Sequence, residues 1–507
     1  MRALPRGSIV AVIGSGAMGS GIAQVAAAAG HQVLLYDTRE HAAGQAIDGI
    51  GKTWARLVEK GRMGAVESDL ARERLRHIGS LQDAAGAALV IEAIVEDLAA
   101  KRALFAELEG IVADDCILAT NTSSIPVTAI AAQLSRPGRL VGMHFFNPVP
   151  LMALVEVVAG LATDPEVAAA VYALAESWGK HPVHARSTPG FIVNRVARPF
   201  YAEGLRLLQE GAADVATLDA VLRDCGGFRM GPFELMDLIG HDVNYSVTKS
   251  VFEAYYGDPR FTPSIVQHEL VSAGFLGRKS GRGFYRYGDG VGPALAQVED
   301  DMPRPAMVRY AGGPGVLDAL VARLSGAGIE LAPREEAPGL YCDGAAIFLT
   351  DGRSATQRAH DDGHPDTIVF DLLLDAAGAS RIALARADGC SDGAWRAAVG
   401  LFQAAGFAVS RLDDVPGMAV MRTVAMLANE AADAVHQGVC SARAVDVAMQ
   451  KGVNYPRGPL AWLDAIGLRH GVTVLDNLAA TYGEDRYRVS PLLRRKLAAN
   501  PHGGFHA

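Results

Sequence analysis

The stretch from Ser8 to Gly19 reads SIVAVIGSGAMG and decides how the first part of the chain folds. Its apolar run, Ser8 to Ile13, predicts a short buried strand of a parallel sheet. The following GSGAMG matches G-x-G-x-x-G, and small residues continue from Ala17 to about Ala29, which predicts a helix that Gly30 ends. In such a turn the first glycine makes a tight bend, the second lets a pyrophosphate approach the backbone, and the third lets the helix pack on the strand. The pattern therefore predicts a dinucleotide site at the start of that helix.

The residue that ends the next strand indicates which dinucleotide binds. His31–Tyr36 predicts a second strand, and Asp37 follows it, 23 residues after Gly14. A carboxylate there binds the ribose hydroxyls of NAD and repels the 2′-phosphate of NADP, so NAD is the predicted cofactor. Arg39 is close enough to leave NADP open, and a turn-capping role is the alternative interpretation of Asp37. The candidate cofactor residues in the turn are Gly14, Gly16, Ala17, Met18 and Gly19.

Strand and helix signals alternate as far as Pro189, which predicts an α/β domain with a doubly wound parallel sheet of the Rossmann type. From Asn194 to about Leu270 the pattern is helical without strand alternation, so a separate all-α domain is expected. The segment Gly288–Pro305 is rich in glycine, proline and acidic residues and predicts a linker. Later strands of the first sheet are expected at Leu89–Ile94, Ile117–Thr120, Leu140–His144 and Leu154–Val158.

The end of the chain repeats the helical domain. The segment Pro189–Arg195 has a counterpart in Pro416–Arg422, and Gly231-Pro232 has one in Gly458-Pro459. Both pairs are offset by 227 residues (416 − 189 and 458 − 231). A constant offset without a gap indicates that the helical domain is duplicated.

Between the two copies, strand and helix signals alternate weakly from Ala306 to Leu412, which predicts a reduced Rossmann-like domain. Its segment Gly312-Gly313-Pro314-Gly315 resembles a decayed dinucleotide turn with a proline inside it, so no nucleotide is expected to bind there. The predicted domains are 1–188 (NAD-binding Rossmann), 189–287 (helical, for substrate and dimerisation), 288–305 (linker), 306–412 (reduced Rossmann-like) and 413–507 (second helical).

A histidine and a glutamate are the candidate catalytic pair. Hydride transfer from an alcohol to a nicotinamide needs a base for the hydroxyl proton, and histidine suits this task near neutral pH. His144 ends an apolar strand, at the sheet edge where ligands bind in such folds. Glu156 stands inside the next apolar run, where a carboxylate needs a partner. We therefore predict a His144–Glu156 pair; a structural histidine and a local salt bridge of Glu156 are the alternatives.

Two further polar positions are candidates for holding the substrate. Asn121-Thr122-Ser123-Ser124 follows a predicted strand end, although such clusters also cap helices. Asn194 stands where the second copy has Met421. This contrast indicates that Asn194 has a role in the chemistry that the second copy does not share. The alternative role of Asn194 is to start a helix.

Composition excludes several classes of function. The formal net charge of −9 argues against binding to nucleic acid or to an acidic membrane surface. No apolar run reaches the ~18 residues that a membrane helix needs, and no signal peptide is expected. The five cysteines are isolated from one another, so neither a metal site nor a disulfide framework is predicted. Free thiols fit a reducing, cytoplasmic location.

Nine motifs occur in order over nearly all of residues 8–287. They are GSGAMG, Asp37, EAIVE (Glu92–Glu96), NTSS (Asn121–Ser124), HFFNPVP (His144–Pro150), LVEV (Leu154–Val157), TPGFIVNR (Thr188–Arg195), GPFELMD (Gly231–Asp237) and GRKSGRGFY (Gly277–Tyr285). In this combination the chain resembles the 3-hydroxyacyl-CoA dehydrogenase family. The resemblance implies NAD-dependent oxidation of an (S)-3-hydroxyacyl-CoA thioester to the 3-oxoacyl-CoA, in the breakdown of fatty acids or of phenylacetate.

The same resemblance implies a role for each matching residue. His144 would be the general base and Glu156 its orienting partner, while Ser123 and Asn194 would hold the substrate oxygen. The residues implied to lie near the nicotinamide half of NAD are Glu96 and Lys101. Asn121 is a further candidate from its residue type, because small hydroxyl and amide groups at that strand end can bond the substrate oxygen or the carboxamide of the nicotinamide. Those implied to contact coenzyme A are Thr53 and Lys60.

A basic stripe agrees with the expected coenzyme A contacts. Lys52, Arg56 and Lys60 fall at i, i+4 and i+8 on one predicted helix face in an acidic protein. A solvated helix face is the alternative interpretation of these three residues.

The two-copy architecture resembles bacterial members of the family that act on 3-hydroxybutyryl-CoA or 3-hydroxyadipyl-CoA. It leaves two assemblies open, a homodimer and a pseudo-dimer formed within one chain. Two other functions also stay open: a dehydrogenase of a hydroxy acid without coenzyme A, and a non-catalytic NAD-binding relative.

Overall fold

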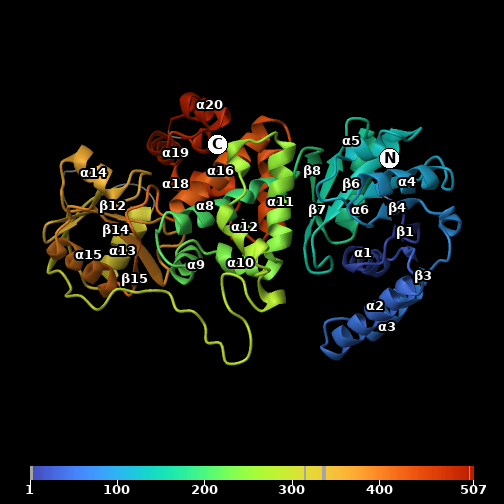
Figure 1. Ribbon diagram of the computed structural model, residues 1–507, viewed down its shortest axis with the longest axis horizontal. Coiled ribbons are helices and arrows are strands. Elements are labelled where there is room, and N and C mark those ends of the chain that lie inside the picture. The colour runs from blue at the N-terminus through green and yellow to red at the C-terminus, as the bar shows by residue number, and fades with distance from the viewer. Residues whose placement is uncertain (1–3, 313–315, 334–337, 502, 507) are drawn as a thin grey trace. The chain divides into compact units, whose positions relative to one another are not determined.

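The computed structural model of the chain describes residues 4–312, 316–333, 338–501 and 503–506. The chain divides into two compact units. The first unit runs to Arg195 and also contains Gln437–Asn454, and the second contains Val196–His436 and the residues from Tyr455 onward. The predicted fold class is confirmed, because two sheets and separate helical regions are present (Figure 1).

The first unit is built on an eight-stranded sheet with the order β3-β2-β1-β4-β5-β6-β7-β8. Its strands are β1 (Ile9–Ile13), β2 (Gln32–Tyr36), β3 (Leu75–His77), β4 (Leu89–Glu92), β5 (Ile117–Thr120), β6 (Leu140–Phe145), β7 (Leu154–Ala159) and β8 (His181–Arg186). The apolar runs that predicted strands are buried between helices, as expected for a sheet covered on its faces.

One strand pair departs from the expected parallel sheet. β6 and β7 are antiparallel, while the other neighbouring strands of this sheet are parallel. The connection Phe146–Ala153 is too short for the helical crossover that a parallel pair needs. The prediction of an all-parallel sheet was therefore wrong at this pair, and β3 and β8 are strands that the apolar pattern did not predict.

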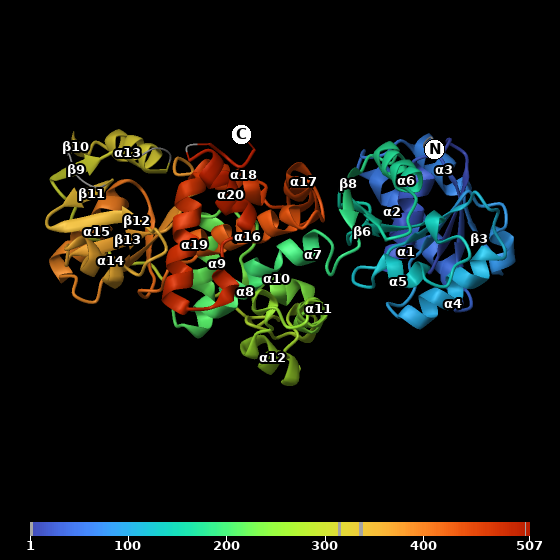
Figure 2. The ribbon, with the colours of Figure 1, turned by 90° about the horizontal axis from the view of Figure 1, so that it is seen from above.

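Helices pack around this sheet (Figure 2). They are α1 (Ala17–Ala28), α2 (Ala42–Glu59), α3 (Ala65–Glu73), α4 (Leu98–Glu109), α5 (Val127–Ala131), α6 (Pro165–Ser177) and α17 (Ala442–Gly452). The short helix α7 (Val193–Val196) follows β8 in the sequence and contains the boundary between the two units. Val10, Val12 and Ile22 have no exposed surface, so α1 is sealed onto the centre of the sheet. The glycine-rich turn is thereby held at the carboxyl edge of β1.

The second unit contains a seven-stranded mixed sheet with the order β10-β9-β11-β12-β13-β14-β15. Its strands are β9 (Met307–Ala311), β10 (Glu330–Pro333), β11 (Gly339–Cys342), β12 (Ala345–Leu349), β13 (Thr367–Phe370), β14 (Arg381–Arg386) and β15 (Ala408–Arg411). Its helices are α13 (Val316–Gly326), α14 (Ala355–Asp362) and α15 (Asp392–Ala404). From β12 to β15 the pairs run parallel, antiparallel and parallel, which repeats β5 to β8 of the first sheet. Gly313 to Gly315 of the predicted decayed turn lie outside the described residues.

The rest of the second unit is helical. The first copy supplies α8 (Arg198–Gln209), α9 (Val215–Asp224), α10 (Pro232–Ile239), α11 (His241–Ala254) and α12 (Ile265–Ser272). The second copy supplies α16 (Val420–His436), α18 (Pro459–Ile466), α19 (Leu468–Tyr482) and α20 (Pro491–Ala499).

Both units also contain short 3-10 helices. They are η1 (Leu81–Ala84), η2 (Pro137–Arg139), η3 (Pro259–Phe261), η4 (Arg278–Ser280) and η5 (Asp485–Tyr487).

The backbone of the two copies matches at the offset of 227 residues. Phe191 has a φ of +47° and its counterpart Met418 a φ of +52°, a conformation that non-glycine residues rarely adopt. Gly240 and Gly467 likewise have φ values of +97° and +94° between two helices. Shared strained positions of this kind indicate a common local fold rather than a chance likeness of sequence.

The two copies pack together through their long helices, α8 against α16. Arg422 of the second copy donates to Glu203 and Glu210 of the first, at 2.7 Å each, and Arg422 and Glu203 are fully buried. In the first unit, Arg195 donates to Gln437 at 2.8 Å, which is the same pairing with the copies exchanged (195 + 227 = 422, 210 + 227 = 437). Reciprocal contacts of one surface with itself are the mark of a two-fold dimer interface.

One helix of each helical copy packs on a sheet: a helix of the second copy on the first sheet, and a helix of the first copy on the second sheet. Helix α17 of the second copy packs on β7 and β8 of the first sheet, and its counterpart α9 of the first copy packs on β14 of the second sheet. No helix in the described part of the chain is long and apolar enough to cross a membrane.

Candidate active site

The glycine-rich turn after β1 has one open position between two crowded ones. Gly14 has a φ of +101°, and a Cβ built there would lie 2.4 Å from a backbone oxygen of the segment after β4. A Cβ at Gly19 would lie 1.8 Å from the oxygen of Gly14, so α1 packs directly on the turn. A Cβ at Gly16 would meet nothing within 4 Å. This open backbone, with Ala17 and Met18 beginning α1 beside it, fits a pyrophosphate at a helix N-terminus.

Asp37 provides a charged acceptor next to that turn. It accepts from the backbone N–H and the hydroxyl of Ser15 at 2.8 and 2.7 Å, and from the guanidinium of Arg39 at 3.0 Å. The hydrogen bonds from Arg39 and then Ser15 outweigh partial burial and hold the pKa of Asp37 well below its usual range. An ionised carboxylate at this edge suits the hydroxyls of a ribose. The adjoining pocket of about 850 Å³ is lined by Gly14, Gly16, Asp37, Ile94, Val95 and Leu104, among others.

A buried lysine joins two carboxylates beneath the site. Lys101 on α4 is 1% exposed, and its ammonium lies 2.6 Å from Glu92 and 3.2 Å from Glu96. Glu92, at the end of β4, also accepts from the hydroxyl of Thr120 at 2.6 Å. Lys101 is therefore covered by the protein, and Glu96 is the more exposed of its two partners. Glu92 is missing from the predicted site, although a carboxylate in a buried strand is the signal that pointed to Glu156.

Glu96 fixes the loop Asn121–Ser124 after β5. Its Oε1 accepts from the hydroxyl of Thr122 at 2.7 Å and from the backbone N–H of Ser123 at 2.9 Å. Burial opposes its ionisation, but these hydrogen bonds and the charge of Lys101 lower the pKa of Glu96 to about 2. The hydroxyl of Ser123 lies 3.4 Å from the same carboxylate oxygen. Glu96 is thus a permanent anion that holds Ser123 at the sheet edge.

Asn121 connects the ends of two strands. Its backbone N–H donates to the carbonyl of Glu92 at 2.8 Å, and its side-chain Oδ1 accepts from the N–H of Phe145 at 2.9 Å. Because Phe145 directly follows His144, this contact sets the spacing between the Ser123 loop and His144.

The antiparallel pair β6–β7 places His144 directly opposite Glu156. Nδ1 of His144 lies 2.6 Å from Oε2 of Glu156, and their residues are 5% and 0% exposed. With Nδ1 engaged by the carboxylate, Nε2 is the nitrogen left to accept a proton. No hydrogen bond to Nε2 occurs among the described residues. The rings of Phe146 and Phe191 lie 4.5 and 5.8 Å from the imidazole and limit its movement.

The second oxygen of Glu156 reaches the start of α7. It accepts from the backbone N–H groups of Ile192 and Val193, both at 3.0 Å. The next residue, Asn194, donates from Nδ2 to the carbonyl of Ser123 at 3.5 Å. The four predicted catalytic residues are therefore brought together at one end of β5, β6 and β7.

The second unit repeats this helix entry without the imidazole. Asp371 directly follows β13 and accepts from the N–H groups of Ala419, Val420 and Met421 at 2.9, 2.7 and 2.9 Å. These residues begin the second helical copy, as the residues bound by Glu156 begin the first. Burial raises the pKa of Asp371 to about 6. No histidine is hydrogen-bonded to Asp371 in the part of the chain that the structure describes.

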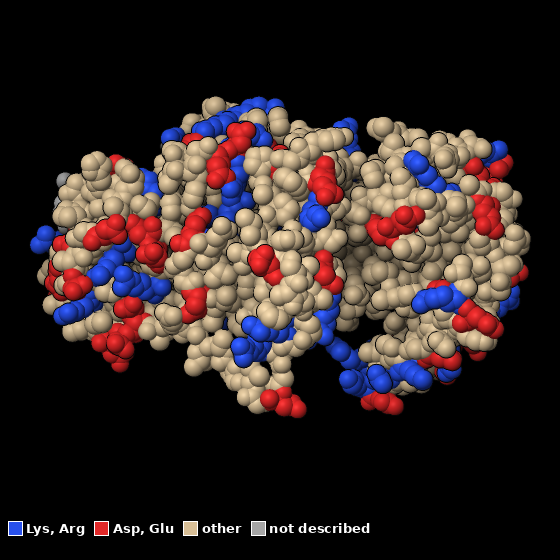
Figure 3. Space-filling model, in the orientation of Figure 1, with Lys and Arg blue, Asp and Glu red and all other residues tan. Residues whose placement is uncertain are grey.

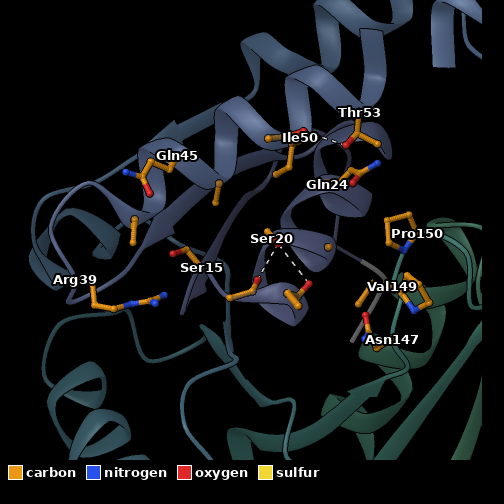
Figure 4. A pocket seen from close by; sticks show the side chains of 17 residues that line it. Ser15, Ser20, Gln24, Arg39, Gln45, Ile50, Thr53, Asn147, Val149 and Pro150 are labelled. Atoms are coloured by element: carbon orange, nitrogen blue, oxygen red, sulfur yellow. Dashed lines mark hydrogen bonds between the residues drawn. The ribbon is translucent and has the colours of Figure 1, made fainter. Parts of the chain in front are cut away.

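A second pocket, of about 610 Å³, lies between α1 and α2 (Figure 4). Arg39 borders it at one end and the loop Asn147–Pro150 at the other, and Thr53 of α2 also lines it. The hydroxyl of Thr53 donates to the carbonyl of Gly49 at 3.0 Å. The loop begins three residues after His144, the candidate base.

The predicted contact Lys60 lies outside this pocket. It caps the C-terminus of α2 and is exposed, as are Lys52 and Arg56 on the same helix. Lys and Arg side chains gather over the α2–α3 hairpin (Figure 3). The hairpin thus offers positive charge outside the residues that line the pocket.

Three family models match the chain. "3-Hydroxyacyl-CoA dehydrogenase, NAD binding domain" matches residues 9–188, and "3-hydroxyacyl-CoA dehydrogenase, C-terminal domain" matches both 190–287 and 417–504. "3-Hydroxybutyryl-CoA dehydrogenase reduced Rossmann-fold domain" matches residues 347–416. The double match agrees with the duplication inferred from the constant offset.

Individual relatives match over the whole chain or over its first half. A 3-hydroxyadipyl-CoA dehydrogenase of Escherichia coli (strain K12) is 45% identical over 96% of this chain and 97% of its own. The crystal structure of a 3-hydroxybutyryl-CoA dehydrogenase from Escherichia coli K12 is 42% identical, with a TM-score of 0.90, and covers 98% of this chain and 99% of that one. The mitochondrial hydroxyacyl-coenzyme A dehydrogenase of Sus scrofa is 39% identical over 55% of this chain and 90% of its own.

Proposed function

The chain belongs to the 3-hydroxyacyl-CoA dehydrogenase family and is an NAD-dependent enzyme, and we propose that it oxidises the 3-hydroxyl of a short (S)-3-hydroxyacyl-CoA to the ketone. The observation that carries this proposal is the 2.6 Å contact between Nδ1 of His144 and Glu156. It leaves Nε2 as a proton acceptor at the sheet edge where the cofactor turn also lies.

The proposed mechanism gives each side chain one task. His144 removes the hydroxyl proton at Nε2, and Glu156 orients the ring and stabilises the imidazolium that forms. Ser123 and Asn194 hold the substrate oxygen, and Glu96 keeps Ser123 in place. When bound, NAD supplies the acceptor for the hydride that leaves C3.

The substrate is proposed from the two pockets and the relatives together. Thr53, Lys60 and the basic residues beside them on the α2–α3 hairpin would bind the coenzyme A portion. The pocket in Figure 4 would guide the thioester to His144. One relative is named for a 3-hydroxyadipyl and one for a 3-hydroxybutyryl thioester. We therefore propose a short acyl chain, in the breakdown of fatty acids or of aromatic acids such as phenylacetate.

The test is NADH production from 3-hydroxybutyryl-CoA, 3-hydroxyadipyl-CoA and free 3-hydroxybutyrate. The thioesters are expected to exceed the free acid in kcat/KM by about 10²-fold or more, because binding energy from the remote coenzyme A is used in the transition state. Equal rates with the free acid would favour a hydroxy-acid dehydrogenase, and no NADH from any thioester would favour a non-catalytic relative.

Replacing Asp37 by serine is expected to raise the KM for NAD by about 10-fold or more, because hydrogen bonds to a charged carboxylate are lost. The preference for NAD over NADP should fall at the same time, because the repulsion of the 2′-phosphate disappears. The measurement is initial rate against each cofactor. Asp69→Asn, at an exposed acid of α3, serves as the control, and an unchanged KM in Asp37→Ser would remove Asp37 from the cofactor site.

We also propose that the chain is a pseudo-dimer that needs no second copy. The reciprocal pairing of Arg422 with Glu203 and Glu210 already occupies the surface that the helical domain would use to dimerise. Size-exclusion chromatography with light scattering is expected to give a mass near 53.2 kDa, that of one chain. A stable mass of twice that value would favour the homodimer instead.

A further inference from the structure

A pocket of about 210 Å³ in the second unit carries a positive charge without a counter-charge. It is formed by α8, α11, η3 and the start of α12. No aspartate or glutamate is among its lining residues in the described part of the chain, while four arginines are: Arg198, Arg206, Arg260 and Arg486.

Three of these arginines have carboxylate partners. The pairs are Arg206–Glu203, Arg260–Asp258 and Arg486–Glu484. The charges of these three arginines are therefore neutralised by carboxylates of the protein and do not call for a bound anion.

Arg198 is the exception. It is 5% exposed, and its Nη1 donates to the hydroxyl of Thr248 at 3.1 Å. Its guanidinium lies 4.8 Å from the ring centre of Tyr201, and its Nε has no hydrogen-bond partner in the protein. Burial lowers the pKa of Arg198, and no carboxylate pairs with it among the described residues. A buried guanidinium without a carboxylate partner is costly unless an anion binds to it.

Other polar atoms of the same pocket are also unpaired. The hydroxyl of Ser264 and Nε of Arg486 are buried and make no hydrogen bond within the protein. Together with Nε of Arg198 they offer three donors to one small space. Guanidinium and hydroxyl donors are the groups that proteins use to bind the oxygens of an anion.

Part of the remaining wall is apolar. Leu205, Phe261, Pro263 and Ile265 line the pocket beside the arginines. Such a wall suits hydrocarbon, so a carboxylate on a short aliphatic chain matches the lining better than a bare inorganic ion. The volume is too small for a nucleotide.

The duplicated copy shows that the helix does not need this arginine. At the offset of 227 residues, the counterpart of Arg198 is Ala425 in α16, which is 2% exposed (198 + 227 = 425). The same helix therefore packs with a methyl group at this position, and the buried charge of the first copy requires another reason.

We propose that this pocket is an anion site that takes the carboxylate of a short aliphatic acid, with Arg198 as its counter-charge. The carboxylate has two sources: a free acid, or the far end of a dicarboxylic acyl chain on the thioester. The second source rests on the proposed dehydrogenase function, and the first does not.

The binding test uses thermal unfolding of the full chain with adipate or phosphate. Saturating adipate is expected to raise the Tm by about 2 °C or more. Arg198→Met, which keeps much of the volume without the charge, is expected to remove that shift and to unfold no earlier than the wild type in anion-free buffer. Arg198→Ala, which copies the packing of Ala425, should behave alike, and Arg229→Met, at an exposed arginine, should keep the shift.

The kinetic arm identifies the source of the carboxylate. If it is that of the substrate, Arg198→Met lowers kcat/KM for 3-hydroxyadipyl-CoA by about 30-fold or more and changes that for 3-hydroxybutyryl-CoA less than about twofold. If it is a free acid, both thioesters respond alike and the adipate shift is still lost in the variant.

Two results would overturn the proposal. One is an adipate shift that survives in Arg198→Met, and the other is the absence of both an adipate shift and a selective kinetic effect. Stabilisation by phosphate alone would contradict the carboxylate assignment. A chain that oxidises no thioester but loses its adipate shift with Arg198 would refute the proposed function and retain the anion site.

Discussion

Replacing His144 by glutamine is expected to lower kcat by about 10²-fold or more, the usual effect of removing a general base. Glutamine fills a similar volume and can still bond Glu156, but it cannot take up a proton. NAD binding should stay nearly unchanged, because the glycine turn and Asp37 lie on other strands. Steady-state rates and NAD titration of the same preparation measure the two effects separately.

The matched control is His181→Gln, at an exposed histidine of β8. It should leave kcat within about twofold, as surface substitutions usually do. Near-normal turnover in the His144 variant would leave the proposed reaction without its proton acceptor.

Replacing Glu156 by glutamine is expected to lower kcat by about 10⁴-fold, the effect of the analogous change in another imidazole–carboxylate pair. Its Oε1 can still accept from the N–H groups of Ile192 and Val193. Its amide, however, presents N–H to Nδ1 of His144, so the imidazole must carry its hydrogen on Nε2. The nitrogen that should accept the substrate proton is then already protonated.

The second unit supplies the control for this variant. Asp371→Asn changes a buried acid that also holds a helix entry but has no imidazole beside it. Both substitutions are expected to reduce stability by about 1–3 kcal/mol, the cost of weakening a buried charged acceptor. Only Glu156→Gln should reduce the rate per folded molecule, so equal losses in the two variants would assign Glu156 a purely structural role.

The contrast between Glu156 and Asp371 also describes how the two halves of the chain differ. Both acids accept backbone N–H groups at the entrance to a helical copy, and both are buried. Only the first stands opposite a histidine across an antiparallel strand pair. The second half therefore repeats the framework of the candidate site without the histidine.

The sequence alone determined the features that depend on local pattern. The G-x-G-x-x-G turn after an apolar strand predicts where the cofactor binds, because backbone geometry at Gly14, Gly16 and Gly19 depends on having no side chain there. Apolar runs located most strands of the first sheet, and the constant offset revealed the duplication. Each of these signals needs only neighbouring residues or a comparison of the chain with itself.

Only the tertiary structure decided which distant residues meet. The sequence predicted that His144 and Glu156 pair, but not the antiparallel direction of β7 that places them opposite each other, because no periodicity encodes strand direction. The burial of Lys101 against Glu92 and the uncompensated charge of Arg198 likewise arise where separate elements pack together. A residue's burial and its partners are set by long-range contacts, so the same side chain in the sequence is compatible with a solvated surface, a structural pair or a binding site.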